Sequence, residues 1–158
     1  QADHFTDAGV STLLESEYAI SEQADRMGMR LTGPVIEHSA KGFNIVSDGI
    51  ASGSIQVPGN GQPIVLLADR QTTGGYPCAA HVISADLPAA GRLRHGDRIR
   101  FEVVSVAEAA AARNARASAL ACFAAAIETE SGAGSTVDDA ALATANLVSG
   151  VTRGDDPG

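Results

Sequence analysis

Lysine is almost missing from this sequence, since Lys41 is the only one among 11 basic residues. A phosphate-binding loop of the GxxxxGK[ST] type needs a lysine beside its glycines, and the sequence has no such loop. A lysine that carries biotin or lipoate would lie in a hairpin between hydrophobic residues, whereas Lys41 stands in "SAKGF", beside a glycine. The sequence therefore predicts a chain that neither binds ATP through a P-loop nor carries a tethered cofactor.

Cysteines, basic charge and long hydrophobic runs are also scarce. The two cysteines, Cys78 and Cys122, lie far apart and suggest no disulfide framework, which favours a reducing cytoplasm. No apolar run approaches the roughly 20 residues that span a bilayer, and the opening "QADHFTDAGV" lacks the basic and apolar regions of an export signal. A net charge of −8 leaves no basic stripe for phosphates. We expect a cytoplasmic protein that binds neither membranes nor nucleic acid.

The remaining composition is that of one globular domain rich in short strands. Of 158 residues, 44% are apolar and 19% are charged, so the chain can bury a core. A short first helix is predicted in "FTDAGVSTLLES", with Thr6 or Asp7 as its N-cap, and another around "DLPAAGRL". Apolar and β-branched stretches between turn residues predict strands: "EYAIS", "FNIVSDGI", "SIQV", "PIVLLA", "AAHVIS" and "GDRIRFEVVSV". The expected fold is mainly β with a few helices, as a closed or nearly closed β-barrel.

The end of the chain differs in composition from the rest. Alanine, the best helix former, dominates the stretch that follows the last predicted strand and predicts one long helix. Its large apolar residues Leu120, Phe123 and Ile127 form a narrow stripe that we expect to pack. The predicted organisation has three parts: a barrel subdomain (1–106), the alanine-rich helix (107–130) and a flexible tail (131–158).

Polar groups gather in the loop "ADRQTTGGYP", directly after the apolar stretch "PIVLLA". Loops after buried strands are where rigid scaffolds present functional groups. Asp69 could accept the N–H of a planar amide and remove its proton, while Arg70 or a glutamine donates to the amide oxygen. Asp69 and Arg70 are the predicted catalytic residues. The predicted substrate-binding residues lie on this loop, on the preceding strand and in the turn between them: Gln56, Asn60, Gln71, Thr72, Thr73, Gly74, Gly75 and Tyr76.

A purely structural role for the same loop stays open from the residues alone. In that alternative, Asp69 and Arg70 satisfy backbone groups at a strand end, and "GGYP" forms a tight corner with the tyrosine packed beneath it. Both interpretations agree on the position of the loop and differ only in whether its side chains contact a substrate.

The histidines and cysteines predict no further site. His38, His81 and His95 have no metal-like spacing with one another or with the cysteines, so we expect structural or surface roles and no metal. Cys78 has no basic neighbour in the sequence, and no nucleophile is predicted there.

Four stretches of the sequence resemble one known family: "ADRMGMRLTGP", "SDGIASGSIQVPGNGQPIVLLADRQTTGGYP", "VISADLP" and "LRHGDRIRF". They are similar to the KipA family, also called the C subunit of 5-oxoprolinase, allophanate hydrolase subunit 2 and the biotin-dependent carboxyltransferase A/B domain. The resemblance runs from Phe5 to Ser105 and looks like the C-terminal half of the longer family members. Within it, Met29 stands where an aromatic residue is common and Cys78 where a basic one is expected. The family fold implied is a cyclophilin-like β-barrel.

The resemblance also implies a chemistry for the polar loop. Family members act on 5-oxoproline, urea or related amides, all of which present a planar N–C=O group. The favoured implication is a subunit of an ATP-dependent 5-oxoprolinase, in which phosphorylation activates the lactam oxygen and water opens the ring to glutamate. One alternative is the carboxyltransferase half of a biotin-dependent urea or amide carboxylase. The other is a regulatory module that antagonises a kinase inhibitor.

Partners follow from the same resemblance. ATP or carboxybiotin would be supplied through a partner subunit or the missing N-terminal half, and this chain itself would bind no cofactor. The expected partners are the B subunit of 5-oxoprolinase or a KipI-like protein, the N-terminal half and a small amide substrate. Without them we expect the isolated chain to be inactive.

Overall fold

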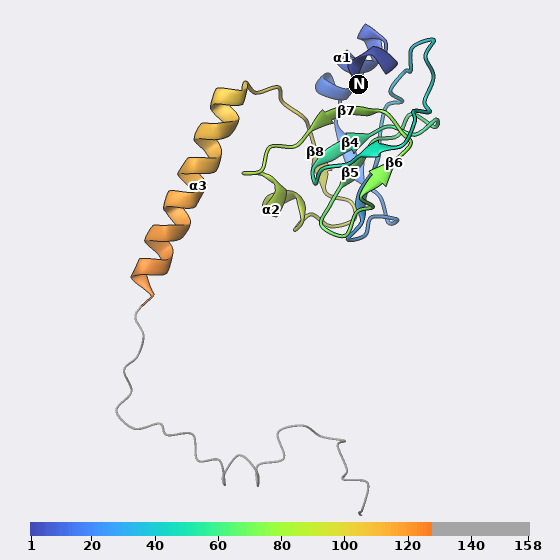
Figure 1. Ribbon diagram of the computed structural model, residues 1–158. Helices are drawn as coiled ribbons and strands as arrows, with labels where there is room; N and C mark the ends of the chain where they lie inside the picture. Colours follow the sequence, from blue (N-terminus) through green and yellow to red (C-terminus); the bar gives the residue numbers. More distant parts are fainter. Residues whose placement is uncertain (128–158) are drawn as a thin grey trace, which may run out of the picture. The chain divides into compact units, whose positions relative to one another are not determined.

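An antiparallel β-sheet holds the hydrophobic core of the chain in the computed structural model, which describes residues 1–127 (Figure 1). Six strands follow the spatial order β7-β4-β5-β2-β1-β8, and β3 pairs with β6 in a separate two-stranded ribbon. The strand bounds are β1 Tyr18–Ile20, β2 Gly28–Thr32, β3 Asp48–Gly49, β4 Ser54–Gln56, β5 Ile64–Leu66, β6 Thr73–Gly74, β7 Cys78–His81 and β8 Arg98–Ile99. The predicted mainly β fold is confirmed.

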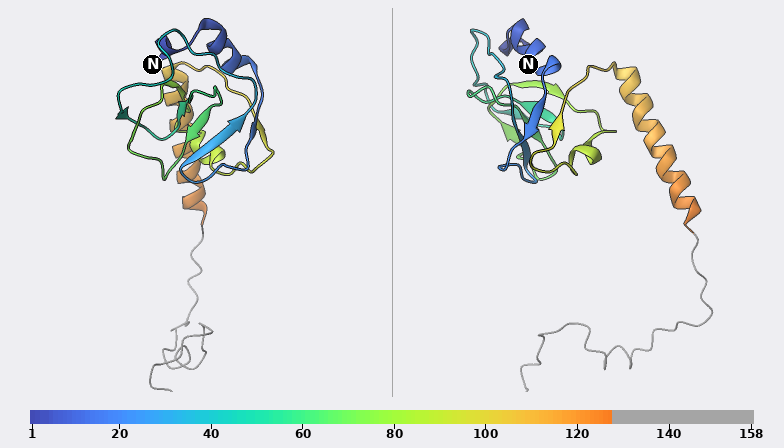
Figure 2. Two further views of the ribbon diagram at one scale, coloured as in Figure 1. Left: turned by 90° about the vertical axis from the view of Figure 1, so that its right-hand side faces the viewer. Right: turned by 180° about the vertical axis from the view of Figure 1, so that it is seen from behind.

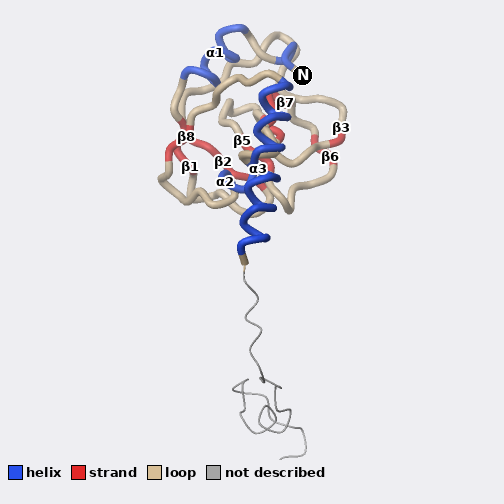
Figure 3. The backbone as a smooth tube through the Cα atoms, turned by 90° about the vertical axis from the view of Figure 1, so that its left-hand side faces the viewer, coloured by secondary structure: helices blue, strands red, loops and turns tan. Residues whose placement is uncertain are grey.

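Helices occur before the first strand, between β7 and β8, and after the last strand described. Their bounds are η1 Ala2–His4, α1 Asp7–Glu15, α2 Leu87–Ala90 and α3 Val106–Ala126. The views in Figure 2 and Figure 3 place α1 and α2 at opposite ends of the sheet, with the β3–β6 ribbon to one side. Within residues 1–127, no helix combines the length and the apolar character that a membrane crossing requires.

A row of apolar side chains crosses the middle of the sheet. Strand pairing places Met29 of β2 opposite Val65 of β5, and Val65 opposite Ile55 of β4. Residues directly opposite each other share a face of the sheet, so the three side chains form one continuous layer. Each is at most 3% exposed, which makes this layer the centre of the core.

Helix α1 begins as the sequence predicts, with Thr6 as its N-cap. Thr6 Oγ1 accepts a hydrogen bond from Gly9 N at 3.0 Å and so satisfies one backbone donor of the first turn. Leu13 is 3% exposed and joins the core. The helix passes so close to the backbone of Glu37 that a Cβ at Gly9 would overlap the Glu37 carbonyl oxygen.

The predicted strand "FNIVSDGI" is mostly irregular. Only Asp48–Gly49 forms a strand, and it pairs with Thr73–Gly74 of β6. Val46 is 93% exposed, whereas Ile45 and Ile50 of the same stretch are half-buried and line a cavity.

The last predicted strand is also shorter than the sequence indicates. Arg98 and Ile99 pair with Ala19 and Tyr18 of β1, but α1 ends only a few residues before Tyr18, so no extended partner is available farther along. The alternation of apolar and charged residues in "GDRIRFEVVSV" predicts that Ile99, Phe101 and Val103 face inward, but Val103 is 72% exposed. The pattern was correct for Ile99 and Phe101, which both pack against the core, and wrong for Val103.

The predicted long helix is present as α3. Its apolar stripe is exposed, with Leu120 at 55%, Phe123 at 69% and Ile127 at 62%, and packing of this stripe stays a prediction. The proposed division into three parts stays a prediction as well, and the tail predicted over 131–158 lies outside the described residues.

Candidate functional site

Asp69 forms an ion pair with Arg26 from the turn before β2. Arg26 Nε donates to Asp69 Oδ2 at 2.6 Å and Arg26 Nη2 to Oδ1 at 3.2 Å, so both carboxylate oxygens accept from one guanidinium. The backbone supports the pair, because Asp69 N donates to Arg26 O at 3.0 Å. The hydrogen bond and charge of Arg26 hold the pKa of Asp69 below its ordinary value. Asp69 is therefore a fixed, ionised carboxylate on a half-exposed surface.

Arg70 ties the polar loop to the end of β3. Its Nε donates to Ile50 O at 3.1 Å, and Ile50 N in turn donates to Thr72 O at 3.0 Å. These bonds hold the loop after β5 against the β3–β6 ribbon. They leave the outer guanidinium nitrogens of Arg70 to other partners.

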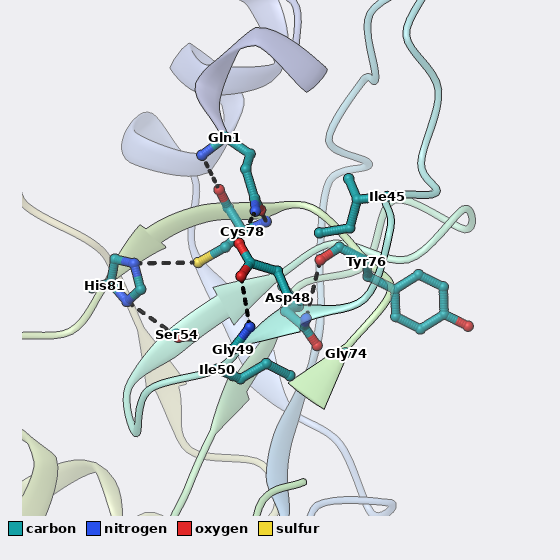
Figure 4. Close-up of a pocket in the computed structure, with 11 residues that line it drawn as sticks. Gln1, Ile45, Asp48, Gly49, Ile50, Ser54, Gly74, Tyr76, Cys78 and His81 are labelled. Atoms are coloured by element: carbon teal, nitrogen blue, oxygen red, sulfur yellow. Dashed lines mark hydrogen bonds between the residues drawn. The ribbon is translucent and has the colours of Figure 1, made fainter. Parts of the chain in front are cut away.

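Three of the predicted substrate-binding residues meet around one small cavity (Figure 4). The cavity holds about 160 Å³ and is lined by Gln1, Ile45, Asp48, Gly49, Ile50, Ser54, Gln56, Gly74, Tyr76, Cys78 and His81. Gln56 is 7% exposed, and its Nε2 donates to Tyr76 O at 3.0 Å. The ring of Tyr76 points away from the cavity in Figure 4, so its backbone and not its phenol contributes to the lining.

Two side chains closely approach Gly74. A Cβ at this position would overlap Ile50 Cδ1 and lie 2.9 Å from Gln56 Nε2. A larger residue would therefore require the Ile50 side chain and the Gln56 carboxamide to shift.

The other predicted site residues lie outside the cavity lining. Asn60 Oδ1 accepts from Gln62 N at 3.1 Å and so stabilises the turn before β5, in which Gly61 has a φ of 71°. Gly75 O accepts from Ile45 N at 2.9 Å. The remaining members of this group belong to the ribbon and its approach: Gln71, Thr72 and Thr73. The functional role of every predicted site residue stays a prediction.

A contact that the sequence did not predict joins Cys78, His81 and Ser54 at the same cavity. His81 lies between the other two in Figure 4, with its Nε2 3.7 Å from Cys78 Sγ and its Nδ1 3.2 Å from Ser54 Oγ. Residues three apart in a regular strand point to opposite faces. The cause here is an irregularity in β7, where Cys78 pairs with Gln56 but His81 pairs with Ser54, which leaves Ala79 as the extra residue of a bulge. No pattern in the local sequence predicts that bulge.

Metal binding has little support in this part of the chain. Among residues 1–127, no group of three or more His, Cys, Asp or Glu side chains is arranged to hold an ion.

Asp48 lies in the cavity lining, and its oxygens accept from Gly49 N at 2.7 Å and Gln1 Nε2 at 3.3 Å. The cavity thus offers amide, carboxylate, hydroxyl, thiol and imidazole groups to a small polar ligand.

Arg26→Gln is expected to raise the pKa of Asp69 toward its ordinary value of 3.8, because the substitution removes the charged hydrogen-bond donor. The lowered pKa means that the pair stabilises the fold above pH 3.8 and that this contribution is lost as the pH falls through the lowered pKa. An NMR titration of the Asp69 carboxyl carbon measures the change. An unchanged pKa in the variant would contradict the ion pair in solution.

Comparisons with known proteins place this arrangement in a family. The profile of the carboxyltransferase domain, subdomain A and B, matches residues 1–103. The C subunit of 5-oxoprolinase from Haemophilus influenzae is 48% identical over 98 residues, which cover 62% of this chain and 31% of that protein. The Escherichia coli protein of the same name is 40% identical over 109 residues, which cover 69% of this chain and 35% of that protein. The chain thus spans about a third of the length of these relatives.

The fold has a counterpart among known structures. The Kluyveromyces lactis urea carboxylase superposes with a TM-score of 0.73 at 23% identity, covering 78% of this chain and 12% of that one.

The putative urea carboxylase of Emericella nidulans is 31% identical over 113 residues, which cover 66% of this chain and 9% of that protein. Since the family profile covers every strand that the structure describes within residues 1–127 and the whole cavity, this chain belongs to the carboxyltransferase domain family, subdomain A and B.

Proposed function

We propose that this chain is the C-terminal part of a 5-oxoprolinase C subunit, which belongs to an enzyme that opens 5-oxo-L-proline to glutamate at the expense of ATP. The observation that carries this proposal is the 48% identity over 98 residues with the Haemophilus influenzae protein of that name. The chain spans only about a third of that relative. We expect the remaining length and a partner subunit to complete the active site.

The cavity supports a compact amide as the ligand. Its volume of about 160 Å³ lies below the roughly 300–1,000 Å³ of ordinary ligand pockets, so it accepts one small reacting group and not a nucleotide. A carboxamide has two N–H donors and one carbonyl acceptor, and Gln56 spends one donor on Tyr76 O. The rest of the Gln56 amide can pair with the N–H and C=O of a lactam. ATP is expected to bind in the partner subunit or in the rest of this protein.

We assign the proton-accepting role to Asp69 and the oxygen-stabilising role to Arg70 in the assembled enzyme. Asp69 is ionised at neutral pH, and only an ionised carboxylate can accept a proton from a substrate nitrogen. The outer nitrogens of Arg70 can donate to an oxygen on which charge develops. Arg70 is bonded to Ile50 at the end of β3, and Ile50 lines the cavity, so we expect the assembled enzyme to hold the reacting group between the loop and the cavity.

The substrate can be tested with the full-length protein and its partner. We expect 5-oxoproline to stimulate ATP hydrolysis and to yield glutamate, whereas the 158-residue chain alone should yield neither product. The second candidate, a urea or amide carboxylase component, is favoured by the 31% identity with the Emericella nidulans protein. Carboxylation of urea from carboxybiotin, without glutamate release from 5-oxoproline, would replace the first proposal with the second.

A further inference from the structure

Cys78 and Cys122 are the two cysteines of the chain, and their surroundings differ. Cys78 is partly buried at the cavity, with His81 Nε2 at 3.7 Å from its sulfur. Cys122 is exposed on α3, between Ala121 and Phe123. Accessibility alone would make Cys122 the faster thiol. The contact with His81 predicts the opposite order.

We propose that Cys78 is a covalent modification site at which low-molecular-weight disulfides form a mixed disulfide, with His81 as the acceptor of the thiol proton. The site depends on the bulge at Ala79, which turns Cys78 and His81 to the same face of β7. It does not depend on the reaction proposed above, because the thiol needs neither a partner subunit nor ATP to react.

Ser54 positions the imidazole for this step. Ser54 is 2% exposed, and its hydroxyl oxygen lies 3.2 Å from His81 Nδ1. In the tautomer with its hydrogen on Nδ1, His81 donates to Ser54 Oγ and turns the lone pair of Nε2 toward Cys78. The thiol donates to Ala80 O at 3.1 Å, and rotation about the Cβ–Sγ bond redirects its hydrogen to Nε2 without moving the sulfur.

The reaction is a thiol–disulfide exchange and needs no further oxidant. The thiol proton moves to His81 Nε2, and the Cys78 thiolate attacks one sulfur of the disulfide. A new S–S bond forms at Cys78 Sγ while the S–S bond of the reagent breaks. The leaving thiolate takes the proton that His81 holds and departs as a free thiol. Cys78 is oxidised, and one half of the disulfide is reduced.

The cavity sets the size of the group that can be attached. About 160 Å³ of space beside Gln56 and Gly74 accommodates a short chain such as a hydroxyethylthio group. Once attached, that group occupies the space in which we placed a small amide ligand. Modification of Cys78 would therefore close the cavity.

The test compares the two thiols of the full chain with 2-hydroxyethyl disulfide at neutral pH, using Cys122→Ser to isolate Cys78 and Cys78→Ser to isolate Cys122. Mass spectrometry follows the adduct. We expect Cys78 to react about tenfold faster or more, and His81→Ala to lower the Cys78 rate by about tenfold, on the scale by which a neighbouring base promotes thiolate chemistry. His95→Ala is the matched control, since it removes an imidazole that contacts Ile20 O and should leave the rate unchanged.

Two results would overturn the proposal. One is equal or faster reaction of Cys122, which would mean that exposure alone controls the rates. The other is an unchanged Cys78 rate in His81→Ala, which would mean that the histidine takes no proton. A thermal melt of each variant shows whether it is folded. If His81→Ala does not fold, the relative reaction rates of Cys78 and Cys122 in the folded single-cysteine chains decide whether the proposal holds.

Discussion

Asp69→Asn and Arg70→Ala are each expected to lower the turnover of the complete enzyme by about 10²-fold or more. Asparagine keeps the size and hydrogen-bonding shape of the side chain but cannot accept the substrate proton. Alanine at position 70 removes the donors that would face the developing oxyanion. Glutamate release at saturating ATP and 5-oxoproline measures both variants, and a thermal melt of each checks that the fold is kept.

Arg26→Gln is the matched control for Asp69→Asn. It breaks the same ion pair but leaves the carboxylate in place, so its turnover should stay well above that of Asp69→Asn. Equal losses in the two variants would mean that Asp69 acts only through its structural pair with Arg26. Near-normal rates for both Asp69→Asn and Arg70→Ala would leave the loop with the structural role that its residues also allow.

Gly9→Ala is expected to destabilise the fold by about 1–3 kcal/mol, the range for overpacking a close contact. Alanine is normally about 1 kcal/mol better than glycine inside a helix, so the expected sign is the reverse of the intrinsic preference. The reason is the backbone of Glu37, whose carbonyl oxygen occupies the space that a Cβ would need. Backbone atoms cannot rotate away as a side chain can, so α1 or the Glu37 segment must move. Urea unfolding measures the change.

Ser11→Ala in the same helix is the control for this prediction. Ser11 is exposed, so the substitution should change the free energy of unfolding by no more than about 0.5 kcal/mol. A Gly9→Ala chain that is as stable as the parent, or more stable, would show that α1 does not lie against Glu37 in solution.

The general fold could be predicted because its signals are local. Thr6 marks the start of α1 by its own side-chain chemistry, and the high helix propensity of alanine predicts α3 from its own residues. Apolar stretches such as the one that contains Val65 predict strands wherever they lie in a sheet. Strand lengths were predicted less well, since Val103 can only be placed once the end of β1 is known.

Some features of the candidate site could likewise be predicted from the sequence, and others depend on the tertiary structure. The sequence by itself determined the family, the polar loop and its content of amide, guanidinium and carboxylate groups, because these depend only on which residues follow one another. The tertiary structure decided that Asp69 pairs with Arg26 and that Gln56 and Gly74 share a cavity. It also decided that Cys78 faces His81. Each of these contacts depends on strand register or on the bulge in β7, and register is set by packing between distant segments, which no local pattern records.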